Sequence, residues 1–166
     1  MSFIAVFISF FLESLFTNFI PTTFTNFSPF LPFFTIISII LIYPYTKNNK
    51  SYFITAGFTG LIYDIAITNT LFLNTLVFLT IAILVAVLNK HFNQTGIFNF
   101  LLSLGILIYY QLITLALLSI TGSKSFQIIT IFMIFISSII INLVYLVILY
   151  LILKKVSINL KLKPRH

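Results

Sequence analysis

The feature that most restricts this chain is a series of long apolar stretches that carry almost no charge. A membrane-crossing helix needs roughly 17–25 mostly apolar residues, and six segments approach this length. We therefore predict an all-α membrane protein, a six-transmembrane-helix bundle that forms a single domain over residues 1–166. The predicted spans are approximately residues 2–19, 30–45, 52–68, 71–88, 98–120 and 126–153.

Composition supports this interpretation and excludes several classes of protein. Only 7% of the residues are charged, whereas a soluble domain usually carries about a quarter. Cysteine is absent, which excludes disulfides and thiolate metal sites, and nothing in the sequence points to a cofactor or another metal. The net charge of +7 comes from cations in the breaks between spans. This distribution does not form a basic groove, so we do not expect nucleic acid as a partner.

The cations also predict the orientation in the membrane, because inner loops collect Lys and Arg. If the first helix begins inside, Lys124 is the single outer cation among the nine. We therefore expect a multi-pass protein of the bacterial plasma membrane with both termini in the cytoplasm. The basic tail, residues 154–165, would then contact anionic lipid. The inner cations would be Lys47, Lys50, Lys90, Lys154, Lys155, Lys161, Lys163 and Arg165.

The two acidic residues, Glu13 and Asp64, both lie inside apolar stretches. An ionisable group at membrane depth is costly unless it is paired, protonated or hydrated, so each is a candidate functional residue. Three roles remain open: a structural polar anchor within the bundle, a contact with a partner protein, or the handling of ions or protons. With the predicted orientation, both carboxylates lie nearer the outer leaflet.

The neighbours of the acids indicate which way they face. Asp64 shares a helix face with Gly57 and Gly60, at i, i+3 and i+7. Small residues let helix backbones approach closely, so Asp64 is expected to face another helix rather than lipid. Polar stripes on other helices predict interhelical hydrogen bonds, and their members are Ser9, Thr17, Ser103, Gln111, Thr114, Thr130, Ser138 and Asn142.

An enzymatic role is not expected. Tyr63-Asp64 is similar to one half of the intramembrane aspartyl protease signature, but the second half, Gly-x-Gly-Asp, is missing. Serine-type intramembrane proteolysis would need a helical histidine. His91 lies in a predicted loop, and His166 is the last residue.

Two motifs resemble the MreD family of rod shape-determining membrane proteins. The stretch from Gly57 to Asp64, Gly-Phe-Thr-Gly-Leu-Ile-Tyr-Asp, with the following Leu71–Leu76, is similar to the central signature of that family. Leu12-Glu13-Ser14 is similar to its early Leu-Glu. One departure is Phe72, which stands where the family often has glycine.

The resemblance implies a non-enzymatic component of the cell-elongation machinery that supports peptidoglycan synthesis. The implied partners are an MreC-like membrane protein and, further, MreB, RodA and a class B penicillin-binding protein. It also implies a helix arrangement resembling the substrate-binding subunits of energy-coupling-factor transporters. Four residues carry over as partner or helix-packing candidates, namely Glu13, Gly57, Gly60 and Asp64.

The alternative is a substrate-binding subunit of an energy-coupling-factor vitamin transporter. Such subunits usually carry an Ala-x-x-x-Ala-like motif on the first helix, whereas this chain has only Ala5 there. They also tend to have aromatic, polar ligand loops, and this chain has no Trp and few charged residues that could serve. The comparison favours the cell-shape interpretation.

Overall fold

A computed structural model describes residues 2–19, 31–68, 70, 72–92, 95–120 and 128–159. Within these ranges the fold is all-helical, without strands, and the predicted count of six helices is confirmed. The α-helices are α1 (Ser2–Phe19), α2 (Phe34–Ile42), α3 (Asn49–Tyr63), α4 (Leu73–His91), α5 (Gly96–Ile120) and α6 (Ile128–Asn159). A 3₁₀ turn, η1 (Tyr43–Tyr45), extends α2, and a π-helical turn, η2 (Asp64–Thr68), extends α3.

The spans differ in length from those predicted. Three described segments are long and apolar enough to cross a membrane unaided, namely Leu73–His91, Gly96–Leu117 and Phe135–Ile158. The apolar segments Phe3–Phe19 and Phe34–Tyr45 are shorter. The predicted span 52–68 ends differently, because its last five residues form the π turn rather than α-helix.

Helix boundaries also shift because local capping, which hydropathy does not register, decides where helices begin. The predicted span 30–45 is helical only from Phe34. α3 begins earlier than predicted, at Asn49, because the Asn48 side chain accepts a hydrogen bond from the Ser51 N–H at 2.7 Å. The later spans 71–88, 98–120 and 126–153 become 73–91, 96–120 and 128–159, residues 71, 126 and 127 lying outside the described ranges.

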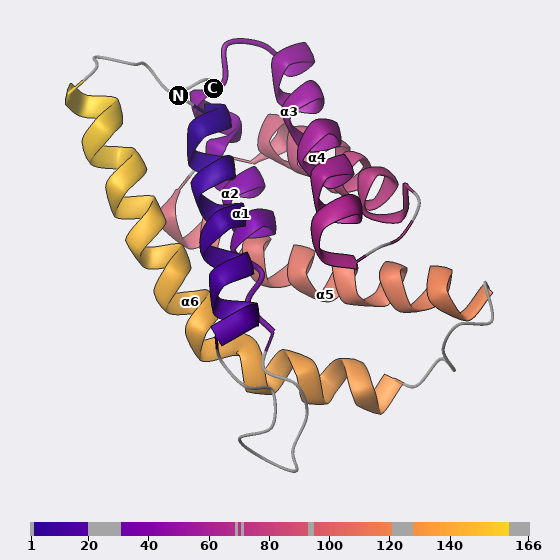
Figure 1. Ribbon diagram of the computed structural model, residues 1–166. Helices are drawn as coiled ribbons and strands as arrows, with labels where there is room; N and C mark the ends of the chain where they lie inside the picture. The colour runs from indigo at the N-terminus through magenta and orange to yellow at the C-terminus, as the bar shows by residue number, and fades with distance from the viewer. Residues whose placement is uncertain are drawn as a thin grey trace.

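α2 forms the centre of the bundle. All nine of its residues are buried, and it contacts α1, α4, α5 and α6. Figure 1 shows α1 in front of α2, and α5 crossing below the α3–α4 pair. A short helix that is apolar on every face is stable only when other helices surround it, so α2 depends on tertiary contacts for its structure.

The outer faces of the remaining helices are apolar, as contact with lipid requires. Large side chains stand exposed along α1, α5 and α6, including Ile4, Ile8, Leu101, Ile140 and Ile152. Interior positions are filled by branched and aromatic side chains such as Ile37, Tyr52, Phe78, Ile81 and Ile106.

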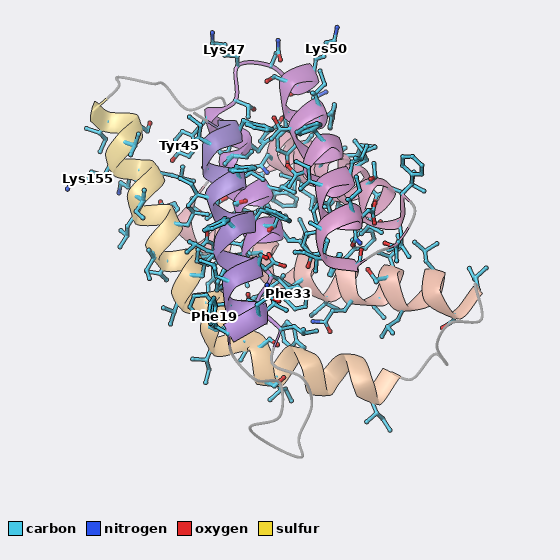
Figure 2. The ribbon with its side chains drawn as sticks, viewed as in Figure 1. Phe19, Phe33, Tyr45, Lys47, Lys50 and Lys155 are labelled. Atoms are coloured by element: carbon cyan, nitrogen blue, oxygen red, sulfur yellow. The ribbon has the colours of Figure 1, made fainter. Side chains whose placement is uncertain are left out.

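Lys47, Lys50 and Lys155 lie toward one end of the structure. Lys47 and Lys50 lie at the top of Figure 2, and Phe19 and Phe33 lie toward the opposite end. Lys155, with Lys154 before it on α6, is exposed near that same upper end. Of the other predicted charges, Lys124, Lys161, Lys163 and Arg165 lie outside the described residues.

Candidate functional site

Glu13 lies buried on α1, with 2% of its surface exposed, and binds the first turn of α2. One carboxylate oxygen accepts a hydrogen bond from the backbone N–H of Thr35 at 2.8 Å, and the other accepts one from the hydroxyl of Tyr63 at 2.7 Å. Thr35 is the second residue of α2, where backbone N–H groups have no partner within the helix. The carboxylate therefore caps α2 from another helix and complements the positive end of its dipole.

Two side chains of α6 complete this helix start. The Ser138 hydroxyl accepts a hydrogen bond from the Leu31 N–H at 2.9 Å, and the Asn142 side-chain oxygen accepts one from the Phe33 N–H at 2.8 Å. The Asn142 amide also donates to the Leu31 carbonyl at 3.3 Å. Irregular backbone at membrane depth is tolerated where protein groups satisfy it, and residues 31–33 meet this condition.

Asp64 serves the start of α4 in the same way. One of its oxygens accepts hydrogen bonds from the Asn74 N–H at 2.8 Å and the Asn74 side-chain amide at 3.0 Å. The other accepts from the Thr75 N–H at 2.9 Å and the Thr75 hydroxyl at 2.8 Å, while Thr70 donates to the first at 2.7 Å. Asp64 is thus a five-fold acceptor that joins the end of α3 to the first turn of α4.

The two glycines on this face of α3 differ in what they contact. A Cβ atom on Gly60 would lie 2.7 Å from the Cα of Thr75 and 2.8 Å from the Asn74 carbonyl oxygen, both backbone atoms. The three atoms nearest to a Cβ on Gly57 all belong to the side chain of Leu79, and the closest lies at 3.3 Å. Gly60 therefore permits the backbone contact at which Asp64 caps α4, and Gly57 has a looser neighbour.

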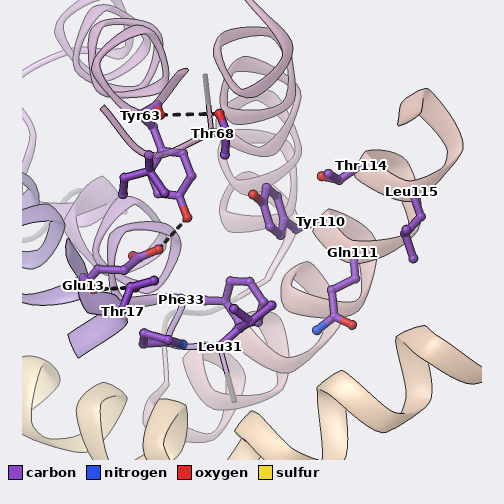
Figure 3. Close-up of a pocket in the computed structure, with 12 residues that line it drawn as sticks. Glu13, Thr17, Leu31, Phe33, Tyr63, Thr68, Tyr110, Gln111, Thr114 and Leu115 are labelled. Carbon is purple, nitrogen blue, oxygen red and sulfur yellow. Dashed lines mark hydrogen bonds between the residues drawn. The ribbon is translucent and has the colours of Figure 1, made fainter. Parts of the chain in front are cut away.

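Adjacent residues connect the two carboxylate sites. Tyr63 bonds toward Glu13, and Asp64 bonds toward Asn74, so one dipeptide serves both helix starts (Figure 3 draws the Tyr63–Glu13 bond). The Tyr110 hydroxyl of α5 donates to the Asn74 side-chain oxygen at 3.0 Å. Glu13 and Asp64 are therefore neighbours in one polar region without bonding to each other.

Several of these participants were not singled out from the sequence. Thr35 and Tyr110 bond to the carboxylate sites, yet nothing in their spacing distinguishes them from other polar residues in apolar helices. Asn74-Thr75 carries the clearer signal, since both types favour helix starts.

The other polar residues predicted to form interhelical hydrogen bonds differ in whether they do so. Ser9 accepts a hydrogen bond from the Tyr145 hydroxyl, whereas Thr17 and Ser103 bond to carbonyls one turn earlier on their own helices. Gln111 is buried and has no hydrogen-bond partner among the described residues. The side chain of Thr130 lies outside the described residues.

Within the described ranges, no group of three His, Cys, Asp or Glu side chains could hold a metal ion.

Comparison with known proteins identifies a family for this chain. The family model described as rod shape-determining protein MreD matches residues 2–157, which contain all the described helices except the last two residues of α6. Neither the curated proteins nor the solved structures gave a match. The matched range also contains both carboxylates and both glycines of the capped helix starts. The chain belongs to the MreD family of rod shape-determining membrane proteins, a family of structural components rather than known enzymes.

Proposed function

We propose that this protein is a non-enzymatic component of the bacterial cell-elongation complex that supports peptidoglycan synthesis through contacts with other membrane proteins. The observation that carries the proposal is the family match across residues 2–157, which covers nearly the whole bundle. An MreC-like protein is the first partner, with MreB, RodA and a class B penicillin-binding protein as further members. The transporter alternative has no support in the comparisons.

Within this role, Glu13, Gly57, Gly60 and Asp64 serve helix packing. Both carboxylates are 2% exposed, and both are occupied by hydrogen bonds from the chain itself. Their contribution to partner binding is indirect, because they fix the positions of α2 and α4. Partners would then contact the apolar side chains exposed on the outer faces of the helices.

Residues 1–166 act as a single transmembrane domain in this proposal. Contacts of α2 with four other helices support it, since no group of the described helices packs separately from the rest. The arrangement resembling substrate-binding subunits of energy-coupling-factor transporters belongs to the same proposal.

The experiment for the function is co-purification. Full-length protein, tagged and extracted from its own membranes in mild detergent, should recover a single-span MreC-like protein, and its depletion should round the cells. Recovery of a tightly bound vitamin with no such partner would contradict the proposal.

The orientation is part of the same proposal, with both termini cytoplasmic and the basic tail against anionic lipid. Clustering of Lys47, Lys50 and Lys155 toward one end supports it. Because the natural chain has no cysteine, single cysteines can report topology without a background. Lys155→Cys should resist a membrane-impermeant maleimide in intact cells, and Lys124→Cys should react. The reverse pattern would invert the orientation.

A further inference from the structure

A cavity of about 280 Å³ lies between α1, α3 and α5, beside the Glu13 site. Ligand pockets usually measure about 300–1,000 Å³, so this cavity suits a small molecule or one chemical group. It is far larger than a site for a single ordered water molecule, which needs roughly 10–15 Å³. The walls combine the polar side chains Glu13, Thr17, Tyr63 and Gln111 with the rings of Phe33 and Tyr110.

Gln111 indicates what kind of group the cavity takes. This side chain is 6% exposed, and neither its amide nitrogen nor its amide oxygen has a hydrogen-bond partner among the described residues. Figure 3 shows it on α5 next to Tyr110, its amide extending toward the side of Leu31 and Phe33. An unpaired buried amide costs about 1–3 kcal/mol, so a filled cavity needs an occupant that both donates and accepts hydrogen bonds.

The polar groups and aromatic rings of the cavity walls restrict the chemical class of the occupant further. On one wall the Glu13 oxygens already accept from Thr35 and Tyr63, so an anionic group there would add further acceptors without a matching donor. An acyl chain would leave the Gln111 amide unpaired. Aromatic rings offer apolar faces to the C–H side of a sugar or polyol, and a side-chain amide suits its neighbouring hydroxyls.

We propose that this cavity binds a neutral polyhydroxyl group about the size of a hexose ring, with Gln111 as its main hydrogen-bonding partner. Phe33, which lines the cavity, lies toward the end opposite Lys47 and Lys50. If those lysines are cytoplasmic, the group enters from the outer leaflet or from outside the cell. A glycolipid headgroup and a free sugar share this chemistry.

The test uses full-length protein in detergent and measures equilibrium binding of three labelled probes: monoglucosyl diacylglycerol, diacylglycerol with the same chains, and free glucose. The expected result is binding of the glucosyl lipid or of glucose in preference to diacylglycerol. Binding of the glucosyl lipid alone assigns a lipid source, and binding of free glucose assigns a soluble one. Absence of binding by both sugar probes, or equal binding of diacylglycerol, would overturn the proposal.

Gln111→Leu separates the amide from general packing. It should weaken binding roughly tenfold, in line with the loss of one buried hydrogen-bonding group. Asn89→Leu is the matched control, since Asn89 is a buried amide with an unpartnered oxygen that does not line the cavity. The control should bind as the natural chain does. Unchanged binding by Gln111→Leu would also overturn the proposal, and binding here is measured independently of partner recovery.

Discussion

The starts of α2 and α4 solve the same physical problem in different ways. Each helix begins inside an apolar bundle, where free backbone N–H groups cannot reach water, and each receives a carboxylate. For α4 the carboxylate comes from Asp64, ten residues before Asn74 and in the same hairpin. For α2 it comes from Glu13 on another helix, and the preceding residues depend on α6, more than 100 positions away.

The two helix starts differ in how many side chains share the capping and therefore in how much stability depends on each one. The α4 start concentrates five hydrogen bonds on one side chain within a short loop, so losing Asp64 removes the whole cap at once. The α2 start divides the task among Glu13, Ser138 and Asn142 on two helices. Each of those should matter less alone, while together they tie three parts of the bundle to one point.

The largest effect is expected from Asp64→Leu. The substitution leaves the N–H groups of Asn74 and Thr75 without an acceptor and removes the acceptor of the Thr75 hydroxyl, and it should lower the free energy of unfolding by about 3 kcal/mol. SDS-induced unfolding followed by circular dichroism measures the loss. The protein should still insert, and recovery of the MreC-like partner should fall.

Asp64→Asn is the matched control, because its side-chain oxygen can still accept part of these bonds. It should lie between the natural protein and Asp64→Leu in stability. Full partner recovery with Asp64→Leu would show that the α4 cap is dispensable for assembly.

The second-largest loss of stability is expected from Gly60→Ala. Its added methyl would overlap the backbone of Thr75 at 2.7 Å, and the first turn of α4 cannot yield without disturbing the Asp64 cap. We expect a loss of about 2–3 kcal/mol, typical of overpacking against rigid atoms. Gly57→Ala tests the contrast, since the flexible Leu79 side chain can move, and its cost should stay below about 1 kcal/mol. Equal losses would mean that the close approach at Gly60 does not set the hairpin geometry.

Glu13→Leu should cost about 2 kcal/mol, because it strands two donors, the Thr35 N–H and the Tyr63 hydroxyl. The double variant with Tyr63→Phe removes one stranded donor and should be less destabilised than the sum of the single losses. The four chains form a double-mutant cycle measured by SDS-induced unfolding. Additive losses would indicate that Glu13 and Tyr63 act independently.

These features differ in how far the sequence could predict them. Hydropathy indicated six helices, and helical periodicity placed Asp64 and Gly60 on one face, because both patterns depend on neighbours along the chain. The break after Thr68 was also visible, since polar Thr and Asn residues interrupt the apolar run there. The Asp64 part of the site, at the start of α4, could therefore be predicted largely from one stretch of sequence.

The Glu13 part of the site, at the start of α2, could not be predicted in this way. Apolarity of residues 30–45 predicted a continuous span, yet Leu31–Phe33 stay irregular because Ser138 and Asn142 satisfy their backbone groups. Likewise, one of the two groups that donate to Glu13 is a backbone N–H, which every residue except proline possesses. No sequence pattern distinguishes Thr35 as that partner, so its assignment depends on how α1, α2 and α3 pack.

The smallest effect, and one of opposite sign, is expected at Phe72, immediately before α4. Its φ of 58° lies in the left-handed region, which disfavours a bulky side chain and favours glycine. Relief of the strain is offset in part by the greater freedom of glycine in the unfolded chain, so Phe72→Gly should stabilise by about 0.5–1 kcal/mol. Phe72→Ala removes the ring but retains the left-handed backbone cost, so it should bring no gain in the SDS unfolding midpoint. Equal midpoints for the Gly and Ala variants would mean that the ring, rather than the backbone, determines the stability of the α4 start.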